Sequence, residues 1–133
     1  MSASIPVPSV HDLVGGEPFF TRLVDRFYEG VATDPVLLSL YPEQPDLAPA
    51  RHRLTLFLVQ YWGGPDTYSE ERGHPRLRMR HAPFAIGTLQ RDRWLAHMSA
   101  ALDAVAPGIP QDARAQLDHY FTMAAEAMRN TPD

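Results

Sequence analysis

LRMRHAPF, residues 77–84, lies near the end of a long segment that interrupts an otherwise helical chain. Between Gly63 and Thr88 the apolar residues follow no helical spacing, and four arginines, two histidines and three prolines stand among few aliphatic side chains. A loop of this length inside a compact domain is usually functional or disordered. The sequence therefore predicts a long loop that is rich in groups able to carry chemistry.

On both sides of this loop, apolar residues recur at intervals of three and four, which predicts amphipathic helices. The main predicted helices are Glu17 to Thr33, Pro49 to the Gly63-Gly64-Pro65 stop, Leu89 to Val105, and a last helix from about Pro110. A short opening helix over 10–14 and a helical turn between Asp34-Pro35 and Tyr41-Pro42 complete the pattern. Because no strand pattern is present, the predicted fold class is all-α.

Composition narrows the class of protein. A chain of 133 residues, 44% of them hydrophobic, predicts a single domain over residues 10–133 that follows a flexible segment over 1–9. A net charge of -4 argues against a general nucleic-acid binder. The absence of cysteine excludes disulfides, thiolate metal sites and cysteine nucleophiles. The chain shows neither a secretory signal nor a membrane span, so we expect a cytoplasmic location.

His81 is the candidate metal ligand among the six histidines, because it lies at the end of the loop between arginines and apolar residues. One imidazole is a poor site for a free metal ion, but it suffices for iron that is already held by the four nitrogens of a porphyrin. Taken alone, a single loop histidine is more often an ordinary polar side chain than a ligand. The assignment therefore depends on its neighbours.

The loop also supplies groups that could meet the two carboxylates of a haem, namely Tyr68 and three alternating arginines at 76, 78 and 80. If this stretch were extended, the alternation would turn all three arginines to one side. The other reading of the same pattern is a solvated run of charge.

Several motifs, in the same order along the chain, resemble those of the group II truncated haemoglobins (O-type, 2-on-2 globins). These motifs are Phe27-Tyr28-Glu29, Asp34-Pro35, Tyr41-Pro42, Gln60-Tyr61-Trp62, Gly63-Gly64-Pro65-Asp66-Thr67-Tyr68-Ser69, Arg72-Gly73-His74-Pro75, Leu77 to Phe84, and Arg91-Asp92-Arg93-Trp94-Leu95. The resemblance covers about residues 10 to 130. It implies a helical sandwich around haem b, in which a loop largely replaces the helix that carries the proximal histidine.

The resemblance also implies roles for individual residues. His81 corresponds to the proximal ligand of the haem iron, and Tyr28, Tyr41 and Trp94 correspond to the residues on the distal side, where the ligand binds. The implied haem contacts are Phe27, Ala50, Arg53, Leu54, Phe57, Leu58, Tyr68 and Arg80.

One position departs from the wider globins. Ala50 stands where a distal histidine is usual, and His52 should point away from the iron because it lies about 200° further around the helix. Hydrogen bonding to a bound ligand would then depend on the phenol O–H and indole N–H groups of the distal aromatic residues, which are donors suited to an apolar pocket.

Three functions remain open at this point. The first is a haem protein of the oxygen-carrier class, which binds dioxygen reversibly. The alternative is a haem-dependent redox enzyme, a nitric oxide dioxygenase or a peroxidase-like protein; it would need a separate reductase, because the chain has no Gly-rich nucleotide fingerprint. The third is a helical interaction module without haem. A homodimer is left open by all three.

Overall fold

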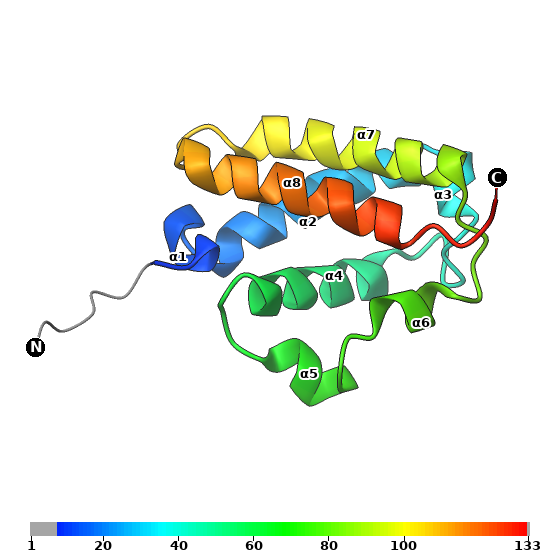
Figure 1. The fold of residues 1–133 in the computed structure, drawn as a ribbon, viewed down its shortest axis with the longest axis horizontal. Helices are drawn as coiled ribbons and strands as arrows, with labels where there is room; N and C mark the ends of the chain where they lie inside the picture. Colours follow the sequence, from blue (N-terminus) through cyan, green and yellow to red (C-terminus); the bar gives the residue numbers. More distant parts are fainter. Residues whose placement is uncertain (1–7, 133) are drawn as a thin grey trace, which may run out of the picture.

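The computed structural model describes residues 8–132, which form eight α-helices and no strand (Figure 1). The helices are α1 (Val10–Val14), α2 (Glu17–Ala32), α3 (Pro35–Leu38), α4 (Ala48–Tyr61), α5 (Thr67–Arg72), α6 (Leu77–His81), α7 (Thr88–Val105) and α8 (Gln111–Ala127). The predicted all-α class and the four main helices are confirmed. Seven of the nine residues predicted as a flexible N-terminal segment lie outside the described residues.

Local sequence sets the helix boundaries. The Ser9 hydroxyl accepts a hydrogen bond from the Asp12 N–H at 3.1 Å, and the Asp34 carboxylate accepts one from the Val36 N–H at 3.0 Å, so both residues act as N-caps. Gly15, with a φ of 93°, ends α1 in the left-handed conformation that glycine adopts without strain. Prolines occupy the first turn of α2, α3 and α4, where the missing N–H costs no hydrogen bond.

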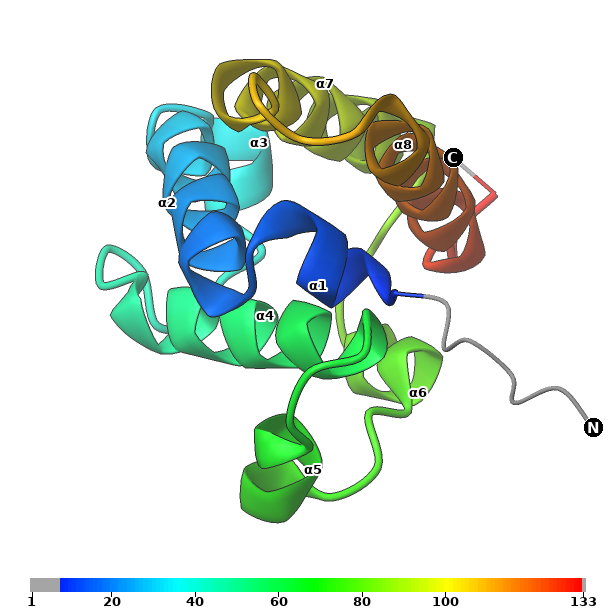
Figure 2. The same cartoon turned by 90° about the vertical axis from the view of Figure 1, so that its left-hand side faces the viewer.

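The long helices form a sandwich. Helix α2 packs against both α7 and α4, and α8 packs against α7, so the α7–α8 layer lies over the α2–α4 layer (Figures 1 and 2). The approach of α2 to α7 is close, because a Cβ atom added at Gly30 would overlap Nδ1 of His97. The apolar stripe of α2 is buried along its whole length, from Phe19 to Val31.

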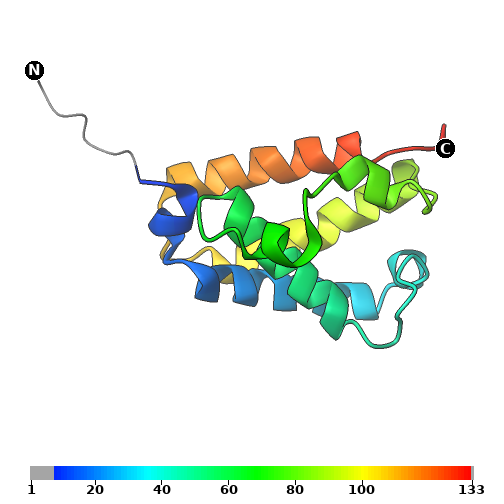
Figure 3. The ribbon, with the colours of Figure 1, turned by 90° about the horizontal axis from the view of Figure 1, so that it is seen from below.

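The predicted loop between Gly63 and Thr88 contains two short helices, α5 and α6, which lie with α4 on one side of the molecule (Figure 3). Hydrogen bonds from α4 hold α5 in place: Ser69 N–H donates to Oε1 of Gln60 at 2.9 Å, and Nε2 of Gln60 donates to the Ser69 hydroxyl at 2.8 Å. The spacing of apolar residues does not predict these two helices, because neither exceeds six residues and an apolar stripe cannot repeat over so short a length.

The extended reading of the alternating arginines is wrong, because residues 77–81 are helical. Successive side chains on a helix turn by about 100°, so the three arginines do not share a side. Arg78 is exposed, whereas Arg80 is partly buried. Arg76 precedes the helix with a φ of 43° and is exposed as well. None of the helices described here is long and apolar enough to cross a membrane.

Candidate functional site

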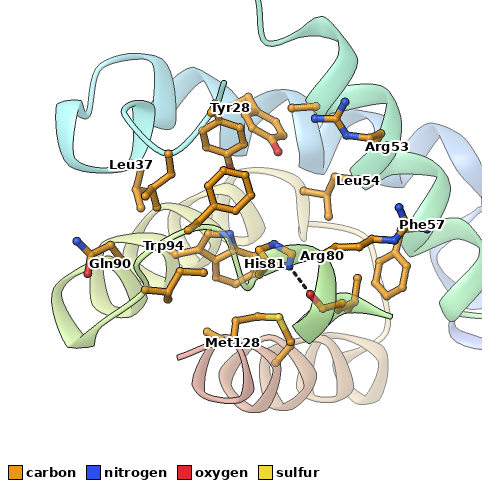
Figure 4. Close-up of a pocket in the computed structure, with 18 of the residues that line it drawn as sticks. Tyr28, Leu37, Arg53, Leu54, Phe57, Arg80, His81, Gln90, Trp94 and Met128 are labelled. Atoms are coloured by element: carbon orange, nitrogen blue, oxygen red, sulfur yellow. Dashed lines mark hydrogen bonds between the residues drawn. The ribbon is translucent and has the colours of Figure 1, made fainter. Parts of the chain in front are cut away.

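A cavity of about 580 Å³ lies between the helices, and side chains from α2, α3, α4, α6, α7 and α8 point into it (Figure 4). All but one of the twelve predicted site residues line it. These lining residues are Tyr28, Tyr41, Ala50, Arg53, Leu54, Phe57, Leu58, Tyr68, Arg80, His81 and Trp94.

Phe27 is the exception. Its side chain is fully buried one layer behind the cavity, where its ring lies 5.3 Å from that of Trp94 and 5.0 Å from that of Tyr28. Phe27 therefore supports two lining aromatic rings from behind instead of lining the cavity itself.

Sequence reasoning missed a group of lining residues, most of them apolar. They are Leu37, Leu40, Pro42, Glu43, Arg72, Leu77, Phe84, Ile86, Gln90, Arg91, Tyr120, Phe121, Ala124, Ala125 and Met128. Five of these belong to α8 or its C-cap, and most of them lie on the apolar stripe that predicted this helix. The stripe was a usable signal, but its position over the cavity is a property of the tertiary structure.

His81 is held by a hydrogen bond within α6. Its Nδ1 lies 2.7 Å from the carbonyl oxygen of Leu77, one turn earlier (Figure 4, dashed line). A carbonyl only accepts, so Nδ1 carries the proton, and Nε2 of the neutral ring keeps a free lone pair. Metal-binding histidines are commonly oriented in this way by a hydrogen bond from the other ring nitrogen.

Asn130, beyond the end of α8, fixes the chain that follows His81. Its Nδ2 donates to the carbonyl oxygens of His81 at 3.2 Å and Phe84 at 2.8 Å, while its Oδ1 accepts from the Ile86 N–H at 2.9 Å. The Asn130 N–H also donates to the Ile86 carbonyl at 2.9 Å. One side chain therefore ties the C-terminal end of the chain to the segment that carries the histidine.

Arg80 ties the linker between α5 and α6 to the cavity wall. Its guanidinium donates to the carbonyl oxygens of Pro75 at 2.6 Å, Arg72 at 2.8 Å and His74 at 3.1 Å. It also lies over the Tyr68 ring, 5.9 Å from the ring centre. These contacts orient the residue next to His81.

Three further arginines line the cavity besides Arg80. Arg53 forms an ion pair with Glu43 at 2.9 Å, and Arg91 forms ion pairs with Asp92 at 3.0 Å and with Glu126. Arg72 is the third. The cavity therefore combines a largely apolar interior with several cations that could meet anionic groups.

Two tyrosines lie side by side on the wall, with the ring centres of Tyr28 and Tyr41 5.5 Å apart in an edge-to-face arrangement. Burial raises the pKa of both phenols, and a hydrogen bond between their hydroxyls raises the pKa of Tyr28 further. Both therefore keep their protons at neutral pH; the hydrogen bond between them uses one of the two O–H groups and leaves the other free to donate. Trp94 points into the same space from α7 (Figure 4).

His52 points away from the cavity, as predicted from its position on α4. Its Nε2 lies 2.9 Å from Oε1 of Glu71 on α5, and more than half of its side chain is exposed. Ala50, two residues earlier, is buried and lines the cavity.

A buried carboxylate fixes the helix that carries Trp94. Asp34 is only 4% exposed, and it accepts hydrogen bonds from Nε and Nη2 of Arg93, both at 3.0 Å, and pairs with Nε2 of His97 at 2.8 Å. The Arg93 guanidinium is the main reason why the pKa of Asp34 falls far below its usual range. This cluster joins the start of α3 to α7 directly beside Trp94.

The donor set indicates the kind of group that the cavity suits. In the described part of the chain, no three histidine, aspartate or glutamate side chains gather as they would around a bare metal ion. His81 offers a single nitrogen, which suits iron that a porphyrin already holds. A helical sandwich with one such histidine, an apolar cavity and cations along it defines a haem-binding protein of the globin class.

Comparison with known proteins gives the family. The chain belongs to the bacterial-like globin family, whose model matches residues 9–130. It is 42% identical over 115 residues to the group 2 truncated hemoglobin YjbI of Bacillus subtilis, an alignment that covers 86% of this chain and 84% of that protein.

Solved structures of similar proteins share the fold. The thermostable hemoglobin of Thermobifida fusca superposes with a TM-score of 0.89 at 60% identity, covering 95% of this chain and all of that one. The group II truncated hemoglobin of Bacillus anthracis gives a TM-score of 0.88 at 36% identity, covering 98% and 96% of the two chains. The predicted truncated 2-on-2 globin fold is therefore confirmed.

Proposed function

We propose that this globin binds haem b with His81 as the proximal ligand, and that it binds dioxygen reversibly on the side of Tyr28, Tyr41 and Trp94. The observation that carries the proposal is the free Nε2 of His81, which lines one cavity with these three donors. His81 would hold the haem, which would supply an iron atom able to take a diatomic ligand.

The residues of the cavity suit this group. A porphyrin is flat and apolar, and the wall offers aromatic and aliphatic side chains such as Leu54, Phe57 and Phe121. Its two propionates are carboxylates, for which arginine is the preferred partner. Arg53 and Arg72 are the proposed partners. Arg80 is less suited, because several of its N–H groups already donate to backbone carbonyls.

The distal residues would hold dioxygen by hydrogen bonds. Because burial keeps Tyr28 and Tyr41 protonated and the hydrogen bond between them uses only one O–H group, the pair can donate the other to a ligand that carries partial negative charge. A hydrogen bond to a charged group contributes about 1.5–3 kcal/mol. Release of oxygen should therefore be slow. A relative of known structure, 39% identical, is described as a truncated oxygen-avid haemoglobin from Bacillus subtilis, which supports this proposal.

A second candidate is redox chemistry at the same site, either the oxidation of nitric oxide or the reduction of a peroxide. It is favoured by the same donors, because groups that stabilise bound oxygen also polarise an O–O bond. Repeated turnover would require electrons from a separate reductase or a small reductant.

The deciding experiment is the visible absorption spectrum of the purified protein after hemin is added, recorded in the ferric state, after reduction, and after exposure to oxygen. A strong Soret band and a persistent oxygen spectrum are expected. No Soret band would overturn haem binding, whereas rapid oxidation without a stable oxygen spectrum would favour the redox function. Nitrate yield over several turnovers with a reductase supplied then tests the enzyme directly.

A further inference from the structure

A pair of tyrosines with their rings in contact connects the cavity with the surface. Tyr120 lines the cavity from α8, and its ring centre lies 4.2 Å from that of Tyr61 at the end of α4, with an angle of 35° between the rings. Tyr61 is 51% exposed, which is unusual for a large apolar ring in this chain. An oxidisable ring on the cavity wall therefore touches an oxidisable ring in contact with solvent.

The aromatic contacts continue on both sides of this pair. Toward the interior, Tyr120 contacts Phe121 at 5.6 Å, and Phe121 contacts Trp94 at 5.8 Å. Phe57, a second lining residue, lies 5.9 Å from Tyr61. Electron transfer weakens steeply with distance, so a chain of touching rings is a faster path than the same separation through aliphatic packing.

Tyr61, Trp62 and Tyr120 contact one another and are all oxidisable. Of these three rings, Tyr61 is the one best placed to lose a proton together with an electron. Burial, with a smaller effect of Tyr61, raises the pKa of Tyr120 to about 12. Trp62 packs against both tyrosines, at 5.0 and 5.4 Å, and its buried Nε1–H meets no acceptor within residues 8–132. Oxidation of a phenol releases its proton, and Tyr61, the most exposed of these three rings, is best placed to pass that proton to water.

We propose that Tyr61 is the surface site that takes single electrons from an electron-rich phenol or hydroquinone and passes them to a hydroperoxide that reacts in the cavity. The proposal rests on haem binding in the cavity, as proposed above. Two Tyr61 oxidations, each giving one electron and one proton, reduce one hydrogen peroxide to two waters. Each phenoxyl then takes one hydrogen atom from a donor molecule, so two donors are oxidised by one electron each.

The substrate class follows from this chemistry. The donor must release a hydrogen atom to a phenoxyl oxygen at the surface, which phenols and hydroquinones do. A flat aromatic donor can also stack on the exposed face of the Tyr61 ring. Such a donor need not enter the cavity, so its size is not limited by the 580 Å³ that the helices enclose.

The test treats the haem-loaded protein with hydrogen peroxide and a nitrone spin trap, and then locates the covalent adducts by peptide mass spectrometry. We expect the main adduct on Tyr61, its loss in Tyr61→Phe, and a several-fold decrease in Tyr120→Phe. Hydroquinone should suppress the adduct and be consumed at one molecule per peroxide, because the two semiquinones formed disproportionate to one quinone and one hydroquinone. Direct two-electron oxidation of the exposed Met79 and Met123 yields sulfoxides, which mass distinguishes from adducts.

A double variant provides the matched control. Tyr61→Phe combined with Thr21→Tyr moves the exposed tyrosine to a position of α2 that is exposed and does not line the cavity. An adduct of equal yield at the new position would overturn the proposal, because contact with Tyr120 would then be unnecessary. A Soret band without any Tyr61 adduct overturns only this inference, whereas failure to bind haem overturns both proposals.

Discussion

The imidazole Nδ1 of His81 lies 2.7 Å from the carbonyl oxygen of Leu77, one helical turn earlier. This bond determines which nitrogen of the ring carries the proton and which keeps a lone pair. A backbone carbonyl is present whatever the side chain, so the acceptor of this bond does not depend on the residue type at position 77. Helix α6 itself thus orients the ring of the proposed ligand.

The first prediction concerns this ligand. His81→Ala should lose tight haem retention, because the cavity offers no second imidazole. His81→Gly should regain haem when free imidazole is added, since the small ligand can occupy the vacated space. Haem transfer to apomyoglobin, followed by absorption, measures retention. His52→Ala is the control, because His52 is on the outer surface, and equal haem loss from both alanine variants would contradict the assignment.

The second prediction concerns the distal donors. Tyr28→Phe and Trp94→Phe each remove one donor without emptying the wall, and each should speed oxygen release by about tenfold, which corresponds to about 1.4 kcal/mol. Stopped-flow release from the reduced, oxygenated protein measures the rate. Rates that match the parent protein in both variants would show that these groups do not hold the ligand.

The third prediction concerns Asp34 and pH. The pKa of Asp34 is lowered in the folded state, so its ion pairs stabilise the fold above the unfolded pKa of about 3.9. This stabilisation is lost as pH falls toward the lower folded value. Asp34→Asn keeps a side chain that can cap α3 but removes the charge, whereas Asp34→Ala should lose the cap as well, at a further cost of about 1 kcal/mol.

Urea unfolding of the parent and Asp34→Asn proteins between pH 3 and 7 tests this prediction. The free energy of unfolding should differ at neutral pH, and the difference should shrink below about pH 4. A difference that stays constant across the range would mean that Asp34 contributes through packing and not through its charge.

The fourth prediction concerns Asn130. Asn130→Ala should free the chain between His81 and Ile86, because it removes three side-chain hydrogen bonds, each worth about 1 kcal/mol. Hydrogen exchange should increase over residues 81–86, and haem should dissociate faster. Asn130→Asp is the comparison, since it can still accept from the Ile86 N–H but cannot donate. Unchanged hydrogen exchange in the alanine variant would show that the Asn130 side chain does not hold residues 81–86 in place.

The sequence predicted the elements better than their arrangement. Repeating apolar positions predict α2, α4, α7 and the start of α8 within one or two residues, because the buried face of a long amphipathic helix repeats several times along the sequence. Helices α5 and α6 are too short for such repetition, and hydrogen bonds from Gln60, a residue of another helix, hold α5 in place. The prediction that the arginines at 76, 78 and 80 lie on one side of an extended segment is wrong for the same reason, because α6 is too short to show a helical pattern.

By itself, the sequence determined the all-α class, the position of the candidate ligand at His81 and the aromatic residues proposed for the distal side, because these depend on local periodicity and on motifs. The tertiary structure decided which side chains share the cavity. It placed Phe27 behind the wall, committed Arg80 to backbone carbonyls, and brought Asn130 to His81 and Tyr120 to Tyr61. Such contacts join residues far apart in the chain, and only the packing of whole helices sets their distances.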